Sequence, residues 1–176
     1  MTTILLVLLA FAPPADIIDR IMAVVGSQPL TLSDVTTATE FRLVDVPGGT
    51  PDPTAFVLDR LIDRTLMLID VDRFQPPEPD PSEITVRIDA LQARAGSPAA
   101  FEAQLAVTGA TRDQLRRYVR DSLRMDTYVN QRFSTLADPN ERAAAIASWI
   151  SDLRRRAQLT VLYHPRLPPG EPARAR

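Results

Sequence analysis

The chain has 176 residues and a formal net charge of −2, and 45% of its residues are hydrophobic while only 6% are aromatic. This length and composition are typical of a single domain whose helices pack through aliphatic side chains. The slightly acidic charge provides no general attraction to nucleic acid. The sequence contains no cysteine and one histidine, and all twenty basic residues are arginine, which excludes thiolate, cysteine–zinc and lysine chemistry.

Residues 1–15 are typical of a secretory signal. An apolar run over residues 4–11 is too short to span a bilayer, and small residues and prolines follow it up to Ala15. The pattern departs from the usual one because no arginine or lysine precedes the apolar run. We therefore expect export, with cleavage after Ala15 and no stable membrane insertion.

The first half of the domain predicted over residues 16–163 combines an extended segment with two helices. Strand-forming residues, turn residues and helix caps mark the boundaries of these elements. The predicted order begins with a strand ending at Val25, a turn over residues 26–29 and a return strand over residues 30–32. A helix over residues 34–43 capped by Ser33, a loop over residues 44–53 and a long helix over residues 54–74 follow.

The second half contains four more helices and a last strand. Proline, serine, threonine and aspartate mark the helix starts, and two glycines mark helix ends. The predicted order begins with a helix capped by Ser82 and ended by Gly96, and a helix from Pro98 to Gly109. A helix from the capping box at residues 111–114 to Phe133 and a helix after Asp138 come next. A strand over residues 159–163 and a disordered tail over residues 164–176 complete the order. We expect a mainly α fold of about six helices, with the N-terminal extended segment and the last strand paired in one small sheet.

No set of residues in the sequence is typical of a catalytic or metal site. The only histidine, His164, lies in the expected tail, where an orienting partner and a pocket are lacking. Phosphate-binding loops, nucleophile elbows and acidic calcium loops are absent from the sequence. We therefore predict no catalytic residue, no metal and no cofactor.

The charged residues are interpreted as solvated helix surface. Asp59 and Asp63 share a helix face, and Arg60 and Arg64 alternate with them along the sequence, which favours salt bridges in water. The arginine-rich segment over residues 112–132 has a small local excess of positive charge, so a solvated face is favoured over contact with RNA.

Three large apolar residues lie on nearly one line of the long helix over residues 54–74. They are Phe56, Met67 and Phe74, and charged residues share the line. Two readings stay open, because another helix could cover the line or the line could form a partly exposed strip. An exposed strip with an adaptable methionine would suit contact with extended chains. These three residues are the candidate polypeptide-binding site.

Three segments carry a family resemblance. They are DRIMAVVGSQPLTLSDV, VLDRLIDRTLMLIDVDRF and FEAQLAVTGATRDQLRRYVRDSL. In order and spacing they resemble the opening strand, second helix and later helices of the N-terminal domain of SurA-type periplasmic chaperones. The resemblance covers residues 19–163, which is nearly all of the expected mature chain.

The resemblance implies a function and also shows a departure from the family. In SurA-like and PrsA-like proteins, one or more parvulin-type prolyl isomerase domains follow the helix that corresponds to the one ending here at Phe133. In this chain only residues 134–137 separate that helix from the closing helix. A single histidine also cannot supply the histidine pair typical of parvulin sites. The resemblance therefore implies an ATP-independent, holdase-like periplasmic chaperone for unfolded outer-membrane or secreted polypeptides, without an isomerase domain.

Two other functions stay open at this point. One is a residual or partner-dependent prolyl isomerase activity. The other is a non-catalytic structural module that forms a homodimer or docks on a dedicated envelope partner. Nucleic acid is not among the expected partners.

Overall fold

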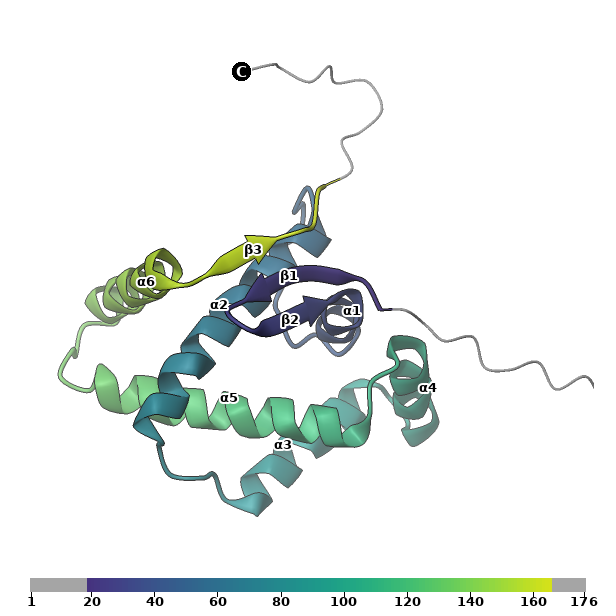
Figure 1. Cartoon of the computed structure of the whole chain (residues 1–176). Coiled ribbons are helices and arrows are strands. Elements are labelled where there is room, and N and C mark those ends of the chain that lie inside the picture. The colour runs from purple at the N-terminus through teal and green to yellow at the C-terminus, as the bar shows by residue number, and fades with distance from the viewer. Residues whose placement is uncertain (1–18, 166–176) are drawn as a thin grey trace, which may run out of the picture.

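The computed structural model describes residues 19–165 and confirms the predicted mainly α fold with a small sheet (Figure 1). The described elements are β1 (Ile21–Val25), β2 (Gln28–Thr31), α1 (Leu32–Glu40), α2 (Pro53–Phe74), α3 (Pro81–Arg94), α4 (Pro98–Thr108), α5 (Arg112–Arg132), α6 (Pro139–Arg156) and β3 (Leu159–Val161). The predicted signal over residues 1–15 and the tail from residue 166 onward lie outside the described residues.

The sheet joins the two ends of the domain, as predicted. Its strand order is β2-β1-β3, and both pairings are antiparallel. β1 and β2 form a hairpin whose turn contains Gly26 with a φ of 60°, a conformation that glycine adopts without steric cost. β3 returns along β1, with Leu159 opposite Val25. Figure 1 shows the hairpin and β3 lying across α2.

The start of α1 differs from the prediction. Thr31 caps this helix, not Ser33, because its hydroxyl accepts a hydrogen bond from the Asp34 amide at 3.3 Å and the Asp34 carboxylate accepts one from the Thr31 amide at 2.8 Å. These two bonds form a capping box. β2 therefore runs directly into α1, which begins at Leu32 and ends at Glu40 instead of extending to residue 43.

The later helix starts agree with the sequence signals with one exception. Ser97, Thr111 and Asp138 cap α4, α5 and α6 as predicted. The cap of α3 is Asp80 and not Ser82, since the Ser82 amide donates to the Asp80 carboxylate at 2.7 Å. Prolines occupy the first turn of α2, α3, α4 and α6, where the missing amide proton has no helical partner.

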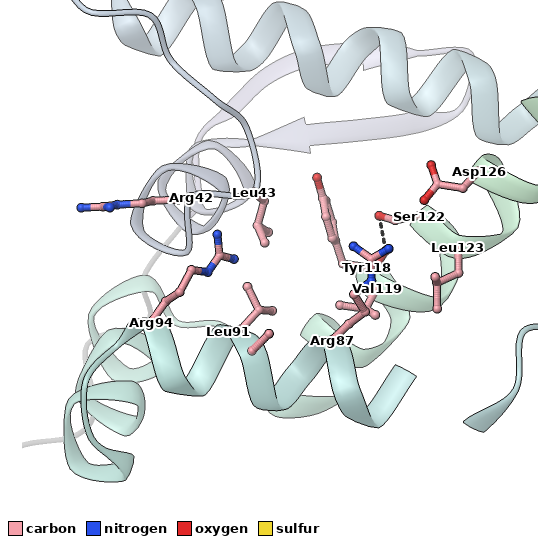
Figure 2. A pocket seen from close by; sticks show the side chains of 11 residues that line it. Arg42, Leu43, Arg87, Leu91, Arg94, Tyr118, Val119, Ser122, Leu123 and Asp126 are labelled. Carbon is pink, nitrogen blue, oxygen red and sulfur yellow. Dashed lines mark hydrogen bonds between the residues drawn. The ribbon is translucent and has the colours of Figure 1, made fainter. Parts of the chain in front are cut away.

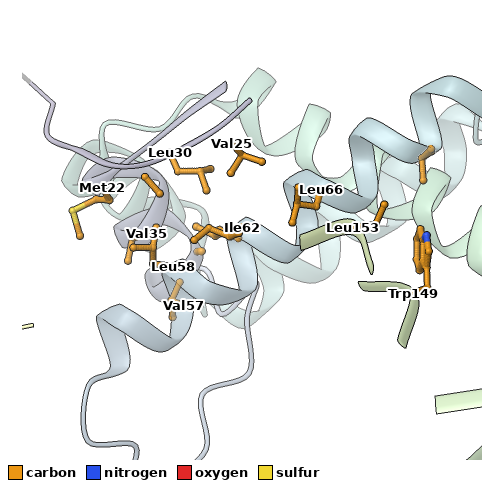
Figure 3. Close-up of a cluster of buried hydrophobic side chains, with 14 of the residues drawn as sticks. Met22, Val25, Leu30, Val35, Val57, Leu58, Ile62, Leu66, Trp149 and Leu153 are labelled. Atoms are coloured by element: carbon orange, nitrogen blue, oxygen red, sulfur yellow. The ribbon is translucent and has the colours of Figure 1, made fainter. Parts of the chain in front are cut away.

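A larger hydrophobic core lies between the sheet, α1, α2, the C-terminal half of α5 and α6 (Figure 3). α2 is its central helix, and its Leu58, Leu61, Ile62 and Leu66 are buried there, while Ile69 is half-buried. Figure 3 shows the α2 side chains between the hairpin residues on one side and Trp149 and Leu153 of α6 on the other.

A smaller core lies between α3, α4 and the N-terminal half of α5. It contains Phe41, from the end of α1, together with Ile88, Leu91, Phe101, Leu105, Leu115 and Val119. The rings of Phe41 and Phe101 meet edge to face with centroids 5.5 Å apart. Among the helices of residues 19–165, none has the length and apolar character needed to cross a bilayer.

Candidate functional site

The three candidate residues on α2 differ in exposure. Phe74 is 59% exposed, and its ring lies 5.2 Å from that of Tyr128. Phe56 is half-buried with the Arg60 guanidinium 5.4 Å from its ring centroid, and Met67 is half-buried against the larger core. Only the C-terminal end of the line is thus open to solvent.

Helix α6 contacts the part of this line on α2 that lies between Phe56 and Phe74. Asp63 and Asp70 are buried there, and Asp63 accepts a bond from Arg154 Nε at 2.5 Å. Asp70 accepts a bond from Trp149 Nε1 at 3.2 Å. The interpretation of Asp63 as solvated surface is therefore wrong, because its partner is an arginine of α6. The binding role of the three apolar residues stays a prediction.

A cavity of about 420 Å³ lies elsewhere, between α3, α5 and the chain that follows α1 (Figure 2). We name it the α3–α5 cleft. Its apolar wall consists of Leu43, Ala90, Leu91, Tyr118, Val119 and Leu123, and its polar rim consists of Arg42, Arg87, Arg94, Ser122 and Asp126. The cleft borders both cores, since Leu91 and Val119 belong to the smaller one and Tyr118 packs against the larger one.

Tyr118 is held in the wall of the cleft by Arg64 of α2. The guanidinium carbon lies 3.7 Å from the centroid of the tyrosine ring. Arg64 Nη2 also donates to the Tyr118 carbonyl at 2.7 Å, and Nη1 donates to Ser122 Oγ at 3.0 Å. Burial lowers the pKa of Arg64 and raises the pKa of the Tyr118 hydroxyl. Tyr118 is therefore a neutral aromatic wall at physiological pH.

Two smaller cavities adjoin the cleft. One, of about 190 Å³, shares Leu43 and Tyr118 and extends toward α1 and α2. The other, of about 230 Å³, shares Arg42, Leu91 and Arg94 and extends toward the end of α1. Neither shares Arg87, Leu123 or Asp126 with the cleft, so both adjoin it toward the Arg42–Leu43 side.

The chain turns sharply at Arg42, beside the cleft. The Leu43 amide donates to the Ala38 carbonyl at 2.8 Å, and the Arg42 amide donates to the Thr39 carbonyl at 3.1 Å. This pair of bonds is a Schellman motif, in which the left-handed position is usually glycine. Arg42 occupies that position with a φ of 48°, so its backbone is strained.

Most of the positive charge of the rim is not neutralised by the protein itself. Within residues 19–165, Arg42, Arg87 and Arg94 form no ion pair with a carboxylate. Arg94 donates to the Phe41 carbonyl at 3.4 Å. An apolar wall with a charged rim can bind an amphipathic segment, whose apolar side chains and polar groups find separate partners.

The sequence offered no direct signal for this cleft. Its three walls come from segments around residues 42, 90 and 120, which only the tertiary fold brings together. Tyr118 lies on α5, and its stacking partner Arg64 is 54 residues away in the sequence. The one local signal is an arginine at the end of α1, where a turn residue such as glycine is usual.

The titratable groups form no metal cluster in the part of the chain that the structure describes. Within residues 19–165, no three histidine, aspartate or glutamate side chains lie close enough together to hold a metal ion. His164 is exposed and lies beyond β3.

No protein-family model matches the chain, and no curated protein is significantly similar to it in sequence.

Proposed function

We propose that this protein is an ATP-independent, holdase-like chaperone of the periplasm that binds unfolded outer-membrane or secreted polypeptides. The observation that carries the proposal is the α3–α5 cleft, with its apolar wall and charged rim at the border of two cores. The resemblance of three sequence segments to SurA-type chaperones supports the same function.

The size of the cleft fits weak and tolerant binding. A volume of about 420 Å³ lies within the usual range of ligand pockets, yet it has room for only a few side chains of a longer polypeptide. Apolar contacts are not directional, so segments of different sequence can bind there. Because few side chains are buried and the client loses entropy on binding, we expect dissociation constants on the order of micromolar.

An aggregation assay tests the proposal. The mature chain from residue 16, in excess over an unfolded outer-membrane protein, should delay the rise of light scattering on dilution from urea. Leu123→Asp should shorten the delay, because it places a charge in the apolar wall at a half-buried site. Val107→Asp, at a residue that is 75% exposed on α4, is the matched control. Absence of any delay with the unmodified protein contradicts the proposal.

The same assay tests the line on α2. Phe74→Ser removes its most exposed side chain, and Phe56→Ser with Met67→Ser tests the half-buried ones. A shorter delay with retained helical circular dichroism would assign the line to binding. Loss of helicity would instead assign it to packing.

A second candidate, a dimerisation module, is favoured by the free edge of β3. In the described residues β3 pairs only with β1, and Val161 and Leu162 beside that edge are 47% and 44% exposed. The opposite edge strand, β2, contains Pro29, which cannot donate a hydrogen bond to a further strand. Light scattering of the purified protein should detect a dimer if β3 pairs with a second copy, and Val161→Lys should then restore the monomer.

A further inference from the structure

The charge of the α3–α5 cleft is opposite in sign to that of the whole protein. The chain has a net charge of −2, whereas three arginines and one aspartate line the cleft. Figure 2 shows Arg94 rising from α3 toward Leu43, with Arg42 directed outward at the same end and Asp126 at the opposite end. The adjoining cavity of about 230 Å³ also contains Glu40, which forms no ion pair with either arginine within residues 19–165. Arg42 and Arg94 therefore lie at one end of the cleft, with Glu40 near them in the adjoining cavity, and Asp126 lies at the other end.

The strain at Arg42 is a second, independent observation. Glycine at this position would satisfy the same Schellman motif without steric cost. The arginine keeps a less stable backbone and places an exposed guanidinium at the end of the cleft that also carries Arg94. Strained residues of this kind cluster at functional sites.

We infer that the α3–α5 cleft selects polypeptide segments in which an acidic side chain lies next to large apolar ones. The acidic side chain pairs with the arginines at the Arg42–Arg94 end, and the apolar side chains lie against Leu43, Leu91 and Leu123. Asp126 at the far end disfavours a second acidic side chain there. This inference rests on the proposed holding function and specifies the clients that bind best.

Two labelled peptides test the selection by fluorescence anisotropy. One is an unstructured ten-residue peptide containing the sequence Leu-Phe-Glu-Leu-Glu, and the other carries glutamine in place of both glutamates. The acidic peptide should bind about five-fold more tightly at low salt, as expected for one or two partly exposed ion pairs. The difference should shrink as salt is added, because screening weakens exposed pairs.

Variants locate the preference in the cleft. Arg42→Gln combined with Arg94→Gln should reduce the preference for the acidic peptide to less than about two-fold. Arg116→Gln combined with Arg117→Gln removes the same charge from exposed positions on α5 outside the cleft, and this control should keep the full preference. Equal loss in both double variants would assign the preference to overall charge and overturn the inference.

Arg42→Gly separates binding from stability. It should raise the midpoint of thermal unfolding by about 2 °C, since the strain is relieved, and it should also weaken the preference for the acidic peptide. A role in folding alone would raise the midpoint and leave the preference unchanged, a result that would remove Arg42 from the site.

Further outcomes distinguish this inference from the function on which it rests. Equal affinity for the two peptides, or binding of neither, overturns the selection of acidic segments. If the protein still delays aggregation in that case, the chaperone function stands without the selection, and if it does not, both fail. If phosphatidylglycerol vesicles displace the acidic peptide from the unmodified protein and bind less well to Arg42→Gln with Arg94→Gln, an anionic lipid is the occupant and the inference is overturned.

Discussion

The two hydrophobic cores of this protein are built in different ways. In the described residues, the larger core has sixteen buried side chains and the smaller one has seven. The larger core also contains polar contacts between distant helices. Asp70 accepts hydrogen bonds from Tyr128 and Trp149, and Asp63 pairs with Arg154.

The smaller core is held together mainly by apolar packing and by helix caps. Its buried polar side chain, Thr108, bonds only to nearby backbone groups, the carbonyls of Gln104 and Leu105 and the amide of Ala110. Ser97 and Thr111 cap α4 and α5 locally. α5 belongs to both cores, since Leu115 lies in the smaller one and Tyr128 in the larger one. One wall of the α3–α5 cleft, at Tyr118, is therefore fixed by the larger core. The wall formed by α3 depends on the smaller core, which has fewer buried side chains.

The largest expected effect comes from Phe101→Ala in the smaller core. Phe101 is fully buried and packs edge to face on Phe41, so its removal should lower the free energy of unfolding by about 3–5 kcal/mol. If the smaller core opens separately, amide hydrogen exchange should accelerate in α3 and α4 before it does in α2 and α6.

The single tryptophan sharpens this test. Trp149 belongs to the larger core, so its fluorescence should follow the larger core alone. In Phe101→Ala, the loss of helical circular dichroism should begin at lower urea than the change in fluorescence. Coincident transitions would show that the two cores unfold as one unit. Val107→Ala, at an exposed site on α4, is the control and should change stability by less than about 0.5 kcal/mol.

The next largest effect comes from Asp70→Ala in the larger core. Trp149 Nε1 and the Tyr128 hydroxyl donate to the same carboxylate oxygen at 3.2 and 3.3 Å. Without it, a buried indole donor is left unsatisfied, which should cost about 2–3 kcal/mol. Urea unfolding followed by Trp149 fluorescence measures this loss.

A conservative variant tests the role of hydrogen bonding at this site. Asp70→Asn keeps an oxygen acceptor and should lose less stability than Asp70→Ala. An equal loss in the two variants would mean that charge, through Arg132 beside Tyr128, matters more than the hydrogen bonds. In both variants hydrogen exchange in α4 should stay unchanged if the two cores are independent.

Local signals in the sequence predicted the elements of both cores. The capping residues Ser97, Thr111 and Asp138 act within one turn of their own helix, so their positions are sufficient to predict a helix start. The Thr31 cap was missed because Ser33 offered the same chemistry two residues later. The closure of the sheet by the last strand was predicted because β1 was its only extended partner.

Contacts between distant segments were not predictable in the same way. Asp63 and Asp70 lie on a helix with many charges, and their buried partners are 91 and 79 residues away. Nothing local distinguishes a carboxylate that meets water from one that meets an arginine of another helix. The α3–α5 cleft is a consequence of how two cores share α5, so the sequence pattern of any one helix did not indicate it.

The last variant concerns a surface pair that joins the loop between α2 and α3 to the middle of α5. Glu78 accepts two hydrogen bonds from Arg120, at 2.6 and 2.8 Å. The hydrogen bond from the Arg120 side chain holds the pKa of Glu78 below its usual range. A lowered carboxyl pKa stabilises the folded state above the unfolded pKa, and this contribution is lost as the pH falls below about 4.

Glu78→Gln should therefore lower the urea midpoint slightly at pH 7 and low salt. The deficit should shrink as the pH falls through the lowered pKa of Glu78 and disappear once the carboxyl is protonated in both states. Glu102→Gln, which breaks an exposed pair with Arg112 between α4 and α5, is the matched control. If Glu78 links the two cores, its removal should also separate the fluorescence and circular dichroism transitions, whereas Glu102→Gln should not. A deficit that persists unchanged once the carboxyl is protonated in both states would mean that the glutamate acts through packing, and the ion pair would then contribute nothing to holding the two cores together.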